Sequence, residues 1–240
     1  MARALAEAGC DAVYSYAGRT ANPPPQPLPT RSGGFGGVEG LTGYLRDQGI
    51  SHVIDATHPF AAQISRNAVA ACARAGVALI ALERPAWQSQ PGDSWLHVAD
   101  FEAAAARLPG DGATVFLAIG RQNLAAFQDC RQRWLLRFAE VAAHPLHDAT
   151  LIVSRGPYTA AGDKALMQRH GVAGVVAKNA GGRAAEAKLT AARDLGLPVL
   201  MIDRPVLPAR RRAGTVKQVM GWLHGADPAP DADPGTDRGV

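Results

Sequence analysis

The sequence contains few cysteines and lacks any long apolar run. The three cysteines, Cys10, Cys72 and Cys130, form no CxxC pair and no Cys/His metal spacing, so neither a disulfide framework nor a metal site is expected. No apolar stretch approaches the ~20 residues that cross a bilayer, and no signal-peptide pattern opens the chain. We therefore expect a cytoplasmic protein with free thiols and no membrane partner.

A strong excess of one charge is also absent, because 25 basic residues stand against 21 acidic ones. Proteins that bind nucleic acid usually concentrate basic residues on one face, whereas here only Arg210, Arg211 and Arg212 form a run, which we expect to be a solvated turn. We therefore expect no nucleic-acid partner. Several single arginines instead follow apolar segments, where α/β folds meet ligands and where arginine can grip carboxylate or phosphate.

Short apolar segments alternate with longer helical patterns along most of the chain. Several of these segments show no in/out alternation, which is typical of parallel strands covered on both faces. The order predicts right-handed βαβ units and an α/β fold of two Rossmann-like lobes with parallel sheets. The expected strands are 12–16, 52–56, 77–82, 114–119, 150–154, 172–177 and 198–202, and the expected helices are 38–48, 60–75, 121–127, 163–170 and 183–195.

A turn-rich break at residues 108–113 divides the pattern. We expect an N-terminal lobe over 1–110 on the cofactor side and a C-terminal α/β lobe over 111–225 on the substrate side. Residues 226–240, rich in Pro, Asp and Gly, are expected to form a disordered tail. Residues 2–8 resemble the second half of a helix, so the first strand and Gly-rich turn of a doubly wound domain are apparently missing.

Two segments of the first lobe suit a dinucleotide. In residues 15–20, Gly18 permits close backbone approach, and Arg19 can accept the 2′-phosphate that distinguishes NADPH from NADH. Residues 31–37 (Arg-Ser-Gly-Gly-Phe-Gly-Gly) precede a helix, and their unshielded N–H groups suit an anion or a cofactor, with Phe35 as a candidate lid. The alternative for Arg19 is a surface charge beside a turn, and the alternative for residues 31–37 is a flexible loop.

A third segment, residues 55–60 (Asp-Ala-Thr-His-Pro-Phe), joins an expected strand to a helix. His58 can donate a hydrogen bond or a proton near neutral pH, and Pro59 suits the first turn of the helix. The alternative is a capping turn, in which Thr57 or His58 caps the helix and the histidine faces solvent.

Three successive strands of the second lobe end in a cation beside glycine. The segments are Gly120-Arg121, Arg155-Gly156 and residues 178–182 (Lys-Asn-Ala-Gly-Gly). Parallel strands end at one edge of a sheet, so the set predicts a basic rim suited to a ligand with several carboxylates. Ordinary turn chemistry with solubilising charges explains each segment alone but the set less well.

In this order, the segments resemble the precorrin-6A reductase family of cobalamin biosynthesis, called cobalt-precorrin-6A reductase in the anaerobic route. The matching stretches are 17–20, 31–37, 54–61, 119–122, 155–157 and 178–182, and the resemblance runs from Met1 to about Leu223. It implies two Rossmann-like lobes and an NADPH-dependent reduction of a double bond in the precorrin-6A or cobalt-precorrin-6A macrocycle, giving precorrin-6B. Family members open with a strand and a Gly-Gly-Thr-x-Glu-Ala turn, which this sequence lacks.

With this resemblance, each candidate residue receives an expected role toward NADPH or the tetrapyrrole. The proton that follows hydride transfer is expected from His58, Lys178 or a bound water. Two hypotheses stay open beside the reductase: an NADP-linked oxidoreductase for another acidic metabolite, and a truncated, non-catalytic corrinoid-binding form. The expected cofactor-binding residues are Gly18, Arg19, Thr20, Gly33, Gly34, Phe35, Gly36, Thr57, Pro59 and Phe60, and the expected substrate-binding residues are Gly120, Arg121, Arg155, Gly156, Asn179, Gly181 and Gly182.

Overall fold

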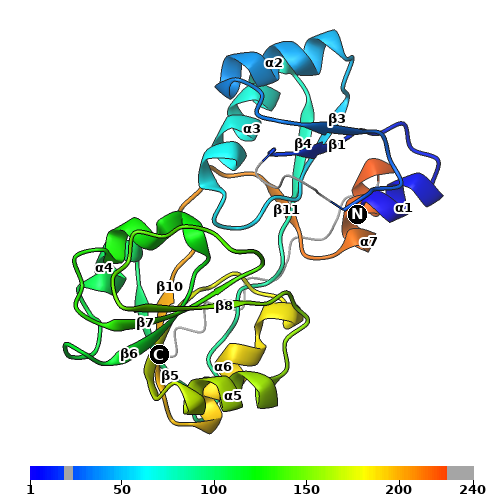
Figure 1. Cartoon of the computed structure of the whole chain (residues 1–240). Coiled ribbons are helices and arrows are strands. Elements are labelled where there is room, and N and C mark those ends of the chain that lie inside the picture. Colours follow the sequence, from blue (N-terminus) through cyan, green and yellow to red (C-terminus); the bar gives the residue numbers. More distant parts are fainter. Residues whose placement is uncertain (19–23, 226–240) are drawn as a thin grey trace, which may run out of the picture. The chain divides into compact units, whose positions relative to one another are not determined.

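The computed structural model describes residues 1–18 and 24–225 and divides the chain into two compact units (Figure 1). Unit 1 comprises Met1–Arg84 and the chain from Val206 onward, and unit 2 comprises Pro85–Pro205. The break expected at 108–113 therefore lies inside unit 2, and the chain returns to unit 1 after Pro205. The expected tail, 226–240, lies outside the described residues.

Unit 1 alternates short strands with helices. Its elements are α1 (Ala2–Glu7), β1 (Tyr14–Tyr16), β2 (Thr30–Ser32), α2 (Gly37–Asp47), β3 (His52–Asp55), α3 (Ala62–Ala75), β4 (Ala78–Leu82), β11 (Arg211–Ala213) and α7 (Val216–Leu223). β1 pairs with β2, and β4 lies between β11 and β3, with every pairing parallel. The carboxyl ends of the paired strands in each sheet therefore share one edge.

Helices α2 and α3 pack together through small and branched apolar side chains. Leu41 and Leu45 lie one turn apart on α2 and meet Ala68, Ala71 and Cys72 of α3. α3 ends at Gly76, whose φ of 70° is a left-handed conformation that glycine adopts without strain. This packing fixes the two loops that lead into the helices, and both loops contain predicted site residues.

Unit 2 is built on one larger sheet. Its elements are β5 (Ser94–Val98), α4 (Phe101–Ala105), β6 (Thr114–Ala118), η1 (Arg121–Phe127), β7 (Arg133–Phe138), β8 (Ala149–Val153), α5 (Ala160–Arg169), β9 (Val172–Lys178), η2 (Arg183–Ala185), α6 (Ala187–Asp194) and β10 (Pro198–Ile202). The strands lie side by side in the order β5-β10-β9-β6-β7-β8, all parallel. Their carboxyl ends therefore share one edge.

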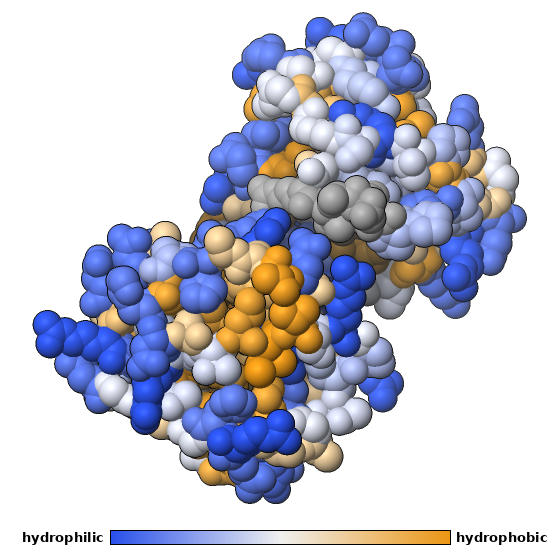
Figure 2. Space-filling view, in the orientation of Figure 1, coloured by the Kyte–Doolittle hydropathy of each residue, from blue (hydrophilic) through white to orange (hydrophobic). Residues whose placement is uncertain are grey.

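The core of unit 2 lies on both faces of this sheet. Phe116 and Leu135 belong to a cluster with Met167 of α5 and Leu189 of α6. Because side chains alternate along a strand, the buried Leu117 points to the opposite face. Figure 2 shows hydrophobic residues gathered at the surface of unit 2 as well. Because both faces of the sheet are covered, its strands are nearly continuous apolar runs in the sequence.

The predicted fold class is confirmed, because the protein is a mixed α/β chain with parallel, Rossmann-like sheets. Each expected strand is present to within two residues, whereas β2, β5, β7 and β11 were not predicted. At the arginine run, Arg211 and Arg212 are exposed as expected, but they lie in β11 and not in a turn, and the side chain of Arg210 is buried in an ion pair with Glu83. No helix in the described parts of the chain is long and apolar enough to cross a membrane.

Candidate active site

Two glycine-containing loops lie in contact where β1 and β2 end. The strands pair with Ser15 opposite Arg31, and Gly33 N–H donates to the Tyr16 carbonyl at 3.0 Å. A Cβ on Gly18 would lie 3.1 Å from the backbone of Gly33, and Gly18 has a φ of 76°. Gly18 therefore needs to be glycine for both space and conformation. The structure thus brings together two of the segments singled out in the sequence.

Arg31 holds the second of these loops, a role that the sequence analysis missed. Its Nη1 donates to Ser15 Oγ at 2.8 Å and to the Gly33 carbonyl at 3.0 Å, while Nη2 donates to the Gly34 carbonyl at 3.2 Å. The guanidinium carbon also lies 3.9 Å from the centroid of the Phe35 ring. Phe35, expected as a lid, is therefore held by Arg31 in this conformation.

The same loop leads into α2 through glycine. Gly36 adopts a φ of 77° before the helix, and the start of α2 has no side-chain cap. A Cβ on Gly40 would lie 1.7 Å from the Phe35 carbonyl oxygen, so only glycine allows the loop to pass over the first turn. The amides of this helix N-terminus carry partial positive charge beside the loop, which favours an anion there.

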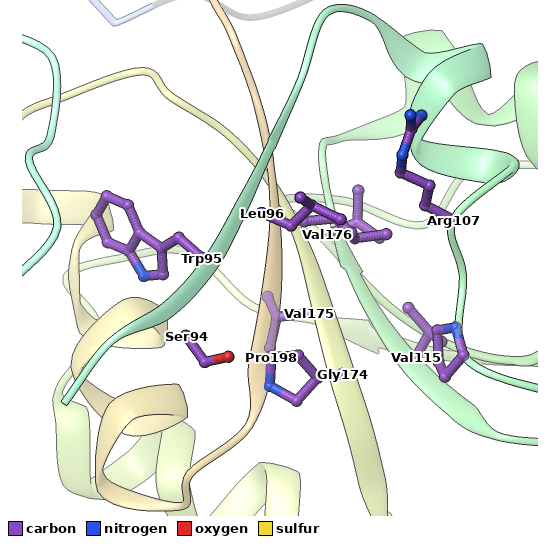
Figure 3. Close-up of a pocket in the computed structure, with 11 residues that line it drawn as sticks. Ser94, Trp95, Leu96, Arg107, Val115, Gly174, Val175, Val176 and Pro198 are labelled. Carbon is purple, nitrogen blue, oxygen red and sulfur yellow. The ribbon is translucent and has the colours of Figure 1, made fainter.

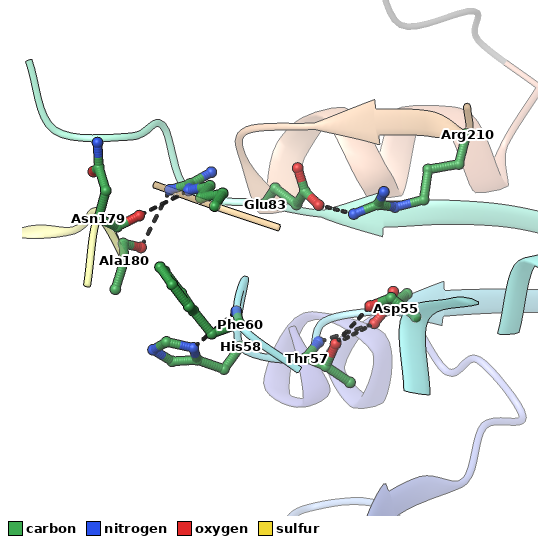
Figure 4. A network of polar contacts seen from close by, with 10 residues as sticks. Asp55, Thr57, His58, Phe60, Glu83, Asn179, Ala180 and Arg210 are labelled. Atoms are coloured by element: carbon green, nitrogen blue, oxygen red, sulfur yellow. Dashed lines mark hydrogen bonds and ion pairs between the residues drawn. The ribbon is translucent and has the colours of Figure 1, made fainter. Parts of the chain in front are cut away.

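The loop after β3 is shaped by Asp55 (Figure 4). This buried carboxylate accepts hydrogen bonds from Thr57 N–H at 3.1 Å and from Thr57 Oγ at 2.7 Å. Thr57 Oγ also lies 3.2 Å from Ser65 Oγ on α3. Burial, with the Asp55 charge, raises the pKa of Cys72 to about 11, so this thiol stays protonated. The hydrogen bonds between Asp55 and Thr57 thus form a turn and do not cap a helix.

His58 projects from this turn and is exposed. Its Nδ1 accepts a hydrogen bond from Phe60 N–H at 3.2 Å, and the two rings lie 5.9 Å apart (Figure 4). With Nδ1 as acceptor, a neutral imidazole carries its hydrogen on Nε2. Pro59, which lies between His58 and Phe60 in the sequence, is buried. Neither Thr57 nor His58 caps α3, which begins at Ala62 without a side-chain cap.

The three cationic segments of unit 2 all follow strands at the carboxyl edge of its sheet. Arg121 follows β6 and Lys178 ends β9, and these two strands are neighbours. Arg155 follows β8. Because β7 separates β8 from β6, Arg155 lies about 10 Å further along the edge than Arg121. Arg155 Nε donates to the Ala139 carbonyl at 3.1 Å. Burial lowers the pKa of Lys178, which favours the neutral amine more than in water.

The loop after Lys178 is anchored by its own polar groups. The buried Asn179 accepts from Trp87 N–H at 2.8 Å through Oδ1 and donates to the Trp87 carbonyl at 3.2 Å through Nδ2. Arg204 Nε donates to the Asn179 carbonyl at 2.9 Å (Figure 4). A Cβ on Gly181 would lie 2.0 Å from the Pro85 carbonyl oxygen. Asn179 and Gly181 therefore shape the loop through contacts within the protein.

A hollow elsewhere in unit 2 does not coincide with this edge (Figure 3). Its lining includes Ser94 and Pro198, the first residues of β5 and β10, together with Leu96 and Val115. Its volume of about 240 Å³ is below the ~300 Å³ at which ligand pockets usually begin. The strand ends therefore remain the better candidate site, in keeping with the rule for open α/β sheets.

Arg19 and Thr20 lie outside the described residues. The sequence analysis missed the roles of Arg31, Gly40 and Arg204, because their contacts with the backbone of Gly33, Phe35 and Asn179 follow from the folded loops and not from residue type alone. Asp55 was quoted in its motif without a role, although an Asp two residues before a Thr is a recognised turn signal. Within the described ranges, no group of three potential ligands gathers to hold a metal ion.

Parallel sheets with glycine loops at strand ends in unit 1 and a cationic edge in unit 2 define a Rossmann-like α/β protein, in which the carboxyl edges of the sheets are the candidate ligand sites. The chain belongs to the family described as Precorrin-6x reductase CbiJ/CobK, whose model matches residues 1–224. Membership makes it an oxidoreductase.

Individual relatives match along nearly the whole chain. It is 58% identical over 233 residues to the precorrin-6A reductase of Rhodobacter capsulatus, covering 95% of this chain and 93% of the relative. It is 45% identical to the precorrin-6A reductase of Rhodococcus erythropolis, covering 92% and 93%. A solved structure titled CobK precorrin-6A reductase superposes with a TM-score of 0.88 at 57% identity, covering 95% and 92%.

Proposed function

We propose that this protein reduces one double bond of precorrin-6A, or of its cobalt-containing counterpart, to give precorrin-6B in cobalamin biosynthesis, with NADPH as the reductant. The observation that carries the proposal is the 58% identity to the R. capsulatus precorrin-6A reductase over 95% of the chain. The chemistry of the two sets of strand ends supports it, because one set suits a dinucleotide and the other suits carboxylates.

Unit 1 is the proposed cofactor side. The contact between Gly18 and Gly33 leaves bare backbone that a dinucleotide can approach, beside the uncapped N-terminus of α2. We assign Gly34, Phe35 and Gly36 to the same surface, Arg19 and Thr20 to the adenosine end, and Thr57, Pro59 and Phe60 to the nicotinamide end. NADPH would supply the hydride, while the protein supplies orientation and electrostatics.

Unit 2 is the proposed substrate side. Arg121, Arg155 and Lys178 present cationic groups at one edge of the sheet, and the macrocycle of the substrate class carries carboxylate side chains. Gly120 and Gly156 adjoin the arginines. Asn179, Gly181 and Gly182 would act by holding the loop that carries Lys178, since the Asn179 amide is bonded to Trp87.

The reduction also needs a proton. Two groups can hold one at a stated atom: His58 at Nε2 and Lys178 at Nζ. Lys178 has the pKa lowered by burial, which makes its ammonium a better acid at neutral pH than an exposed lysine. Both remain candidate proton donors in this proposal.

Turnover of precorrin-6A with NADPH, followed by nicotinamide absorbance and by identification of the product, tests the proposal. Binding of NADPH without turnover would favour a different acidic metabolite, and failure to bind NADPH would favour a non-catalytic form. Arg19→Ala should weaken NADPH much more than NADH, because only NADPH carries the 2′-phosphate. Arg3→Ala, at an exposed position of α1, is the matched control; equal losses for both cofactors would remove Arg19 from the phosphate role.

A further inference from the structure

Tyr158, in the loop that joins β8 to α5, has no role in the proposed function. Its side chain is half-buried, whereas Arg155, Gly156 and Pro157 of the same loop are exposed. The phenol oxygen donates a hydrogen bond to the Ser154 carbonyl at 2.8 Å. The Tyr158 side chain therefore folds back over the loop and holds the peptide that comes just before Arg155.

The ring of Tyr158 is itself held by a buried ion pair. The guanidinium carbon of Arg137, on β7, lies 3.6 Å from the centroid of the Tyr158 ring. The same guanidinium donates to both oxygens of Asp163, on α5, at 2.5 and 3.3 Å. A cation over an aromatic face attracts it more strongly when both are shielded from water. The ring thus rests on groups that belong to the core of unit 2.

Hydrogen bonds also fix the two ends of this loop. At the first end, Ser154 N–H donates to the Phe138 carbonyl at 2.9 Å. At the second end, Thr159 Oγ accepts from Gly162 N–H at 3.1 Å and so caps α5. Loops at the surface are usually more mobile than the elements that they connect. With both ends fixed and Tyr158 folded over the loop, we expect residues 155–157 to stay close to one conformation.

The guanidinium of Arg155 has a defined orientation within this loop. Its Nε donates to the carbonyl of Ala139, the residue after β7, at 3.1 Å. Across residues 1–18 and 24–225 this is the one hydrogen bond or ion pair that Arg155 makes. The two terminal nitrogens, Nη1 and Nη2, therefore remain available. Together they form the planar fork whose N–H groups match the two oxygens of a carboxylate.

We propose that Tyr158 is a positioning residue, which holds Arg155 so that Nη1 and Nη2 bind one side-chain carboxylate of the tetrapyrrole end-on. The inference rests on the proposed function, which assigns Arg155 to the substrate. A loop that is fixed before binding loses less conformational freedom when the ligand arrives. Tyr158 therefore strengthens substrate binding through Arg155. A lysine in place of Arg155 would keep the charge but not the fork.

The first test needs no ligand. In the full chain with ¹⁵N-labelled arginine, the Arg155 Nε resonance is assigned with Arg155→Lys, and its heteronuclear NOE reports side-chain motion on picoseconds to nanoseconds. We expect a high NOE in wild type, a lower one in Tyr158→Phe, which loses the bond to Ser154, and the lowest in Tyr158→Leu. Tyr14→Phe, the same change in β1 of unit 1, should leave the NOE unchanged. An NOE that is the same in wild type and both Tyr158 variants overturns the inference.

The second test is a double-mutant cycle in steady-state turnover. Tyr158→Phe should raise KM for precorrin-6A roughly fivefold, the effect of one neutral hydrogen bond, with kcat and the KM for NADPH unchanged. Arg155→Lys should raise it roughly tenfold or more, because the fork is lost. Since Tyr158 acts through Arg155, adding Tyr158→Phe to Arg155→Lys should change KM by less than about twofold. Additive losses, as a general structural role would give, overturn the inference.

The outcomes separate the two claims. If wild type does not reduce precorrin-6A, the proposed function fails, while the ligand-free NOE still decides whether Tyr158 holds Arg155. If wild type turns over and either Tyr158→Phe or Arg155→Lys keeps the wild-type KM for precorrin-6A, the positioning role is overturned. Should Tyr158→Leu not fold, Tyr158→Phe, which keeps the ring on Arg137, carries both tests and is read in the same way.

Discussion

Units 1 and 2 are both parallel α/β structures, yet their strand ends are built differently. In unit 1 the loops approach bare backbone, as at Gly18 and Gly40, where a Cβ would collide or lie unusually close. In unit 2 the loops carry cations, and the loop after Lys178 is anchored by the buried amide of Asn179 and by the half-buried Arg204, much as Arg31 holds a loop of unit 1. The comparison shows how one architecture can serve two ligand chemistries through its loops alone.

Individual charge pairs differ widely in exposure, and each unit holds both kinds, since the Arg210–Glu83 pair of unit 1 is also buried. The Arg74–Glu39 pair of unit 1 is exposed, with 53% and 84% of the side chains accessible, whereas the Arg137–Asp163 pair of unit 2 has 11% and 4%. Exposed pairs contribute little to stability, whereas breaking a buried pair leaves an uncompensated charge. The protein should therefore be far more sensitive to removal of a charge from the Arg137–Asp163 pair than from the Arg74–Glu39 pair.

The largest expected effect follows from that contrast. Asp163→Asn should destabilise the protein by about 3 kcal/mol, because the Arg137 guanidinium stays buried without its carboxylate. Glu39→Gln, the matched change in unit 1, should cost less than about 0.5 kcal/mol. Urea denaturation of the two variants measures both values, and similar costs would remove the distinction between the buried and the exposed pair.

The next effect concerns buried amides. Asn179→Ala should cost about 2–3 kcal/mol, because it leaves the N–H and carbonyl of Trp87 without their partner. Asn67→Ala in unit 1 removes only a contact with the Gln63 side chain on α3 and should stay within about 0.5 kcal/mol. A small loss for Asn179→Ala in thermal or urea unfolding would show that the loop is not anchored as described.

The free energy of unfolding should also depend on pH through Lys188, a buried lysine of unit 2. Burial depresses the pKa of Lys188 from 10.5 to about 8, so the unfolded chain binds one more proton than the folded chain between these values. Stability linked to this residue therefore rises with pH through that window. Relative to Lys188→Met, wild type should gain roughly 2 kcal/mol between pH 7 and pH 9.5. A constant difference in unfolding free energy across this range would contradict the depressed pKa.

The smallest expected effect lies within one helix of unit 1. Gly40→Ala should cost about 1–2 kcal/mol and weaken NADPH binding, because its Cβ would displace the Phe35 carbonyl. Gly43→Ala, also in α2, meets nothing within 4 Å and should stabilise the protein by about 0.5–1 kcal/mol. Unfolding and NADPH titrations of both variants measure this; equal behaviour would mean that the loop does not rely on Gly40.

The sequence predicted the elements whose residues are apolar and locally patterned. β9 and β10 are nearly uninterrupted apolar runs, and both were located to within one residue. β2 and β11, with the sequences Thr-Arg-Ser and Arg-Arg-Ala, have no apolar run, and the partner of β11, β4, lies far along the chain. The return of the chain to unit 1 at Val206 likewise depends on distant contacts, which local composition does not encode.

For the candidate site, the position of the loops was predictable from the sequence. Motifs of glycine and cations after strands located the loops, because ligand edges follow from parallel topology. What each side chain does within a loop was not predictable. Asn179 was expected to meet substrate, but its amide is bonded to Trp87, 92 positions earlier in the chain. Arg31 stood in a quoted motif without a role and Arg204 in none, since their roles arise from contacts made only in the fold.

Amide hydrogen exchange of the full chain with and without NADPH tests most directly the claim that unit 1 holds the cofactor and unit 2 the acidic substrate. The account predicts that NADPH slows exchange first and most strongly in residues 15–20, 31–40 and 56–60 of unit 1. Protection that is instead confined to residues 119–122, 154–157 and 178–182 of unit 2 would contradict it.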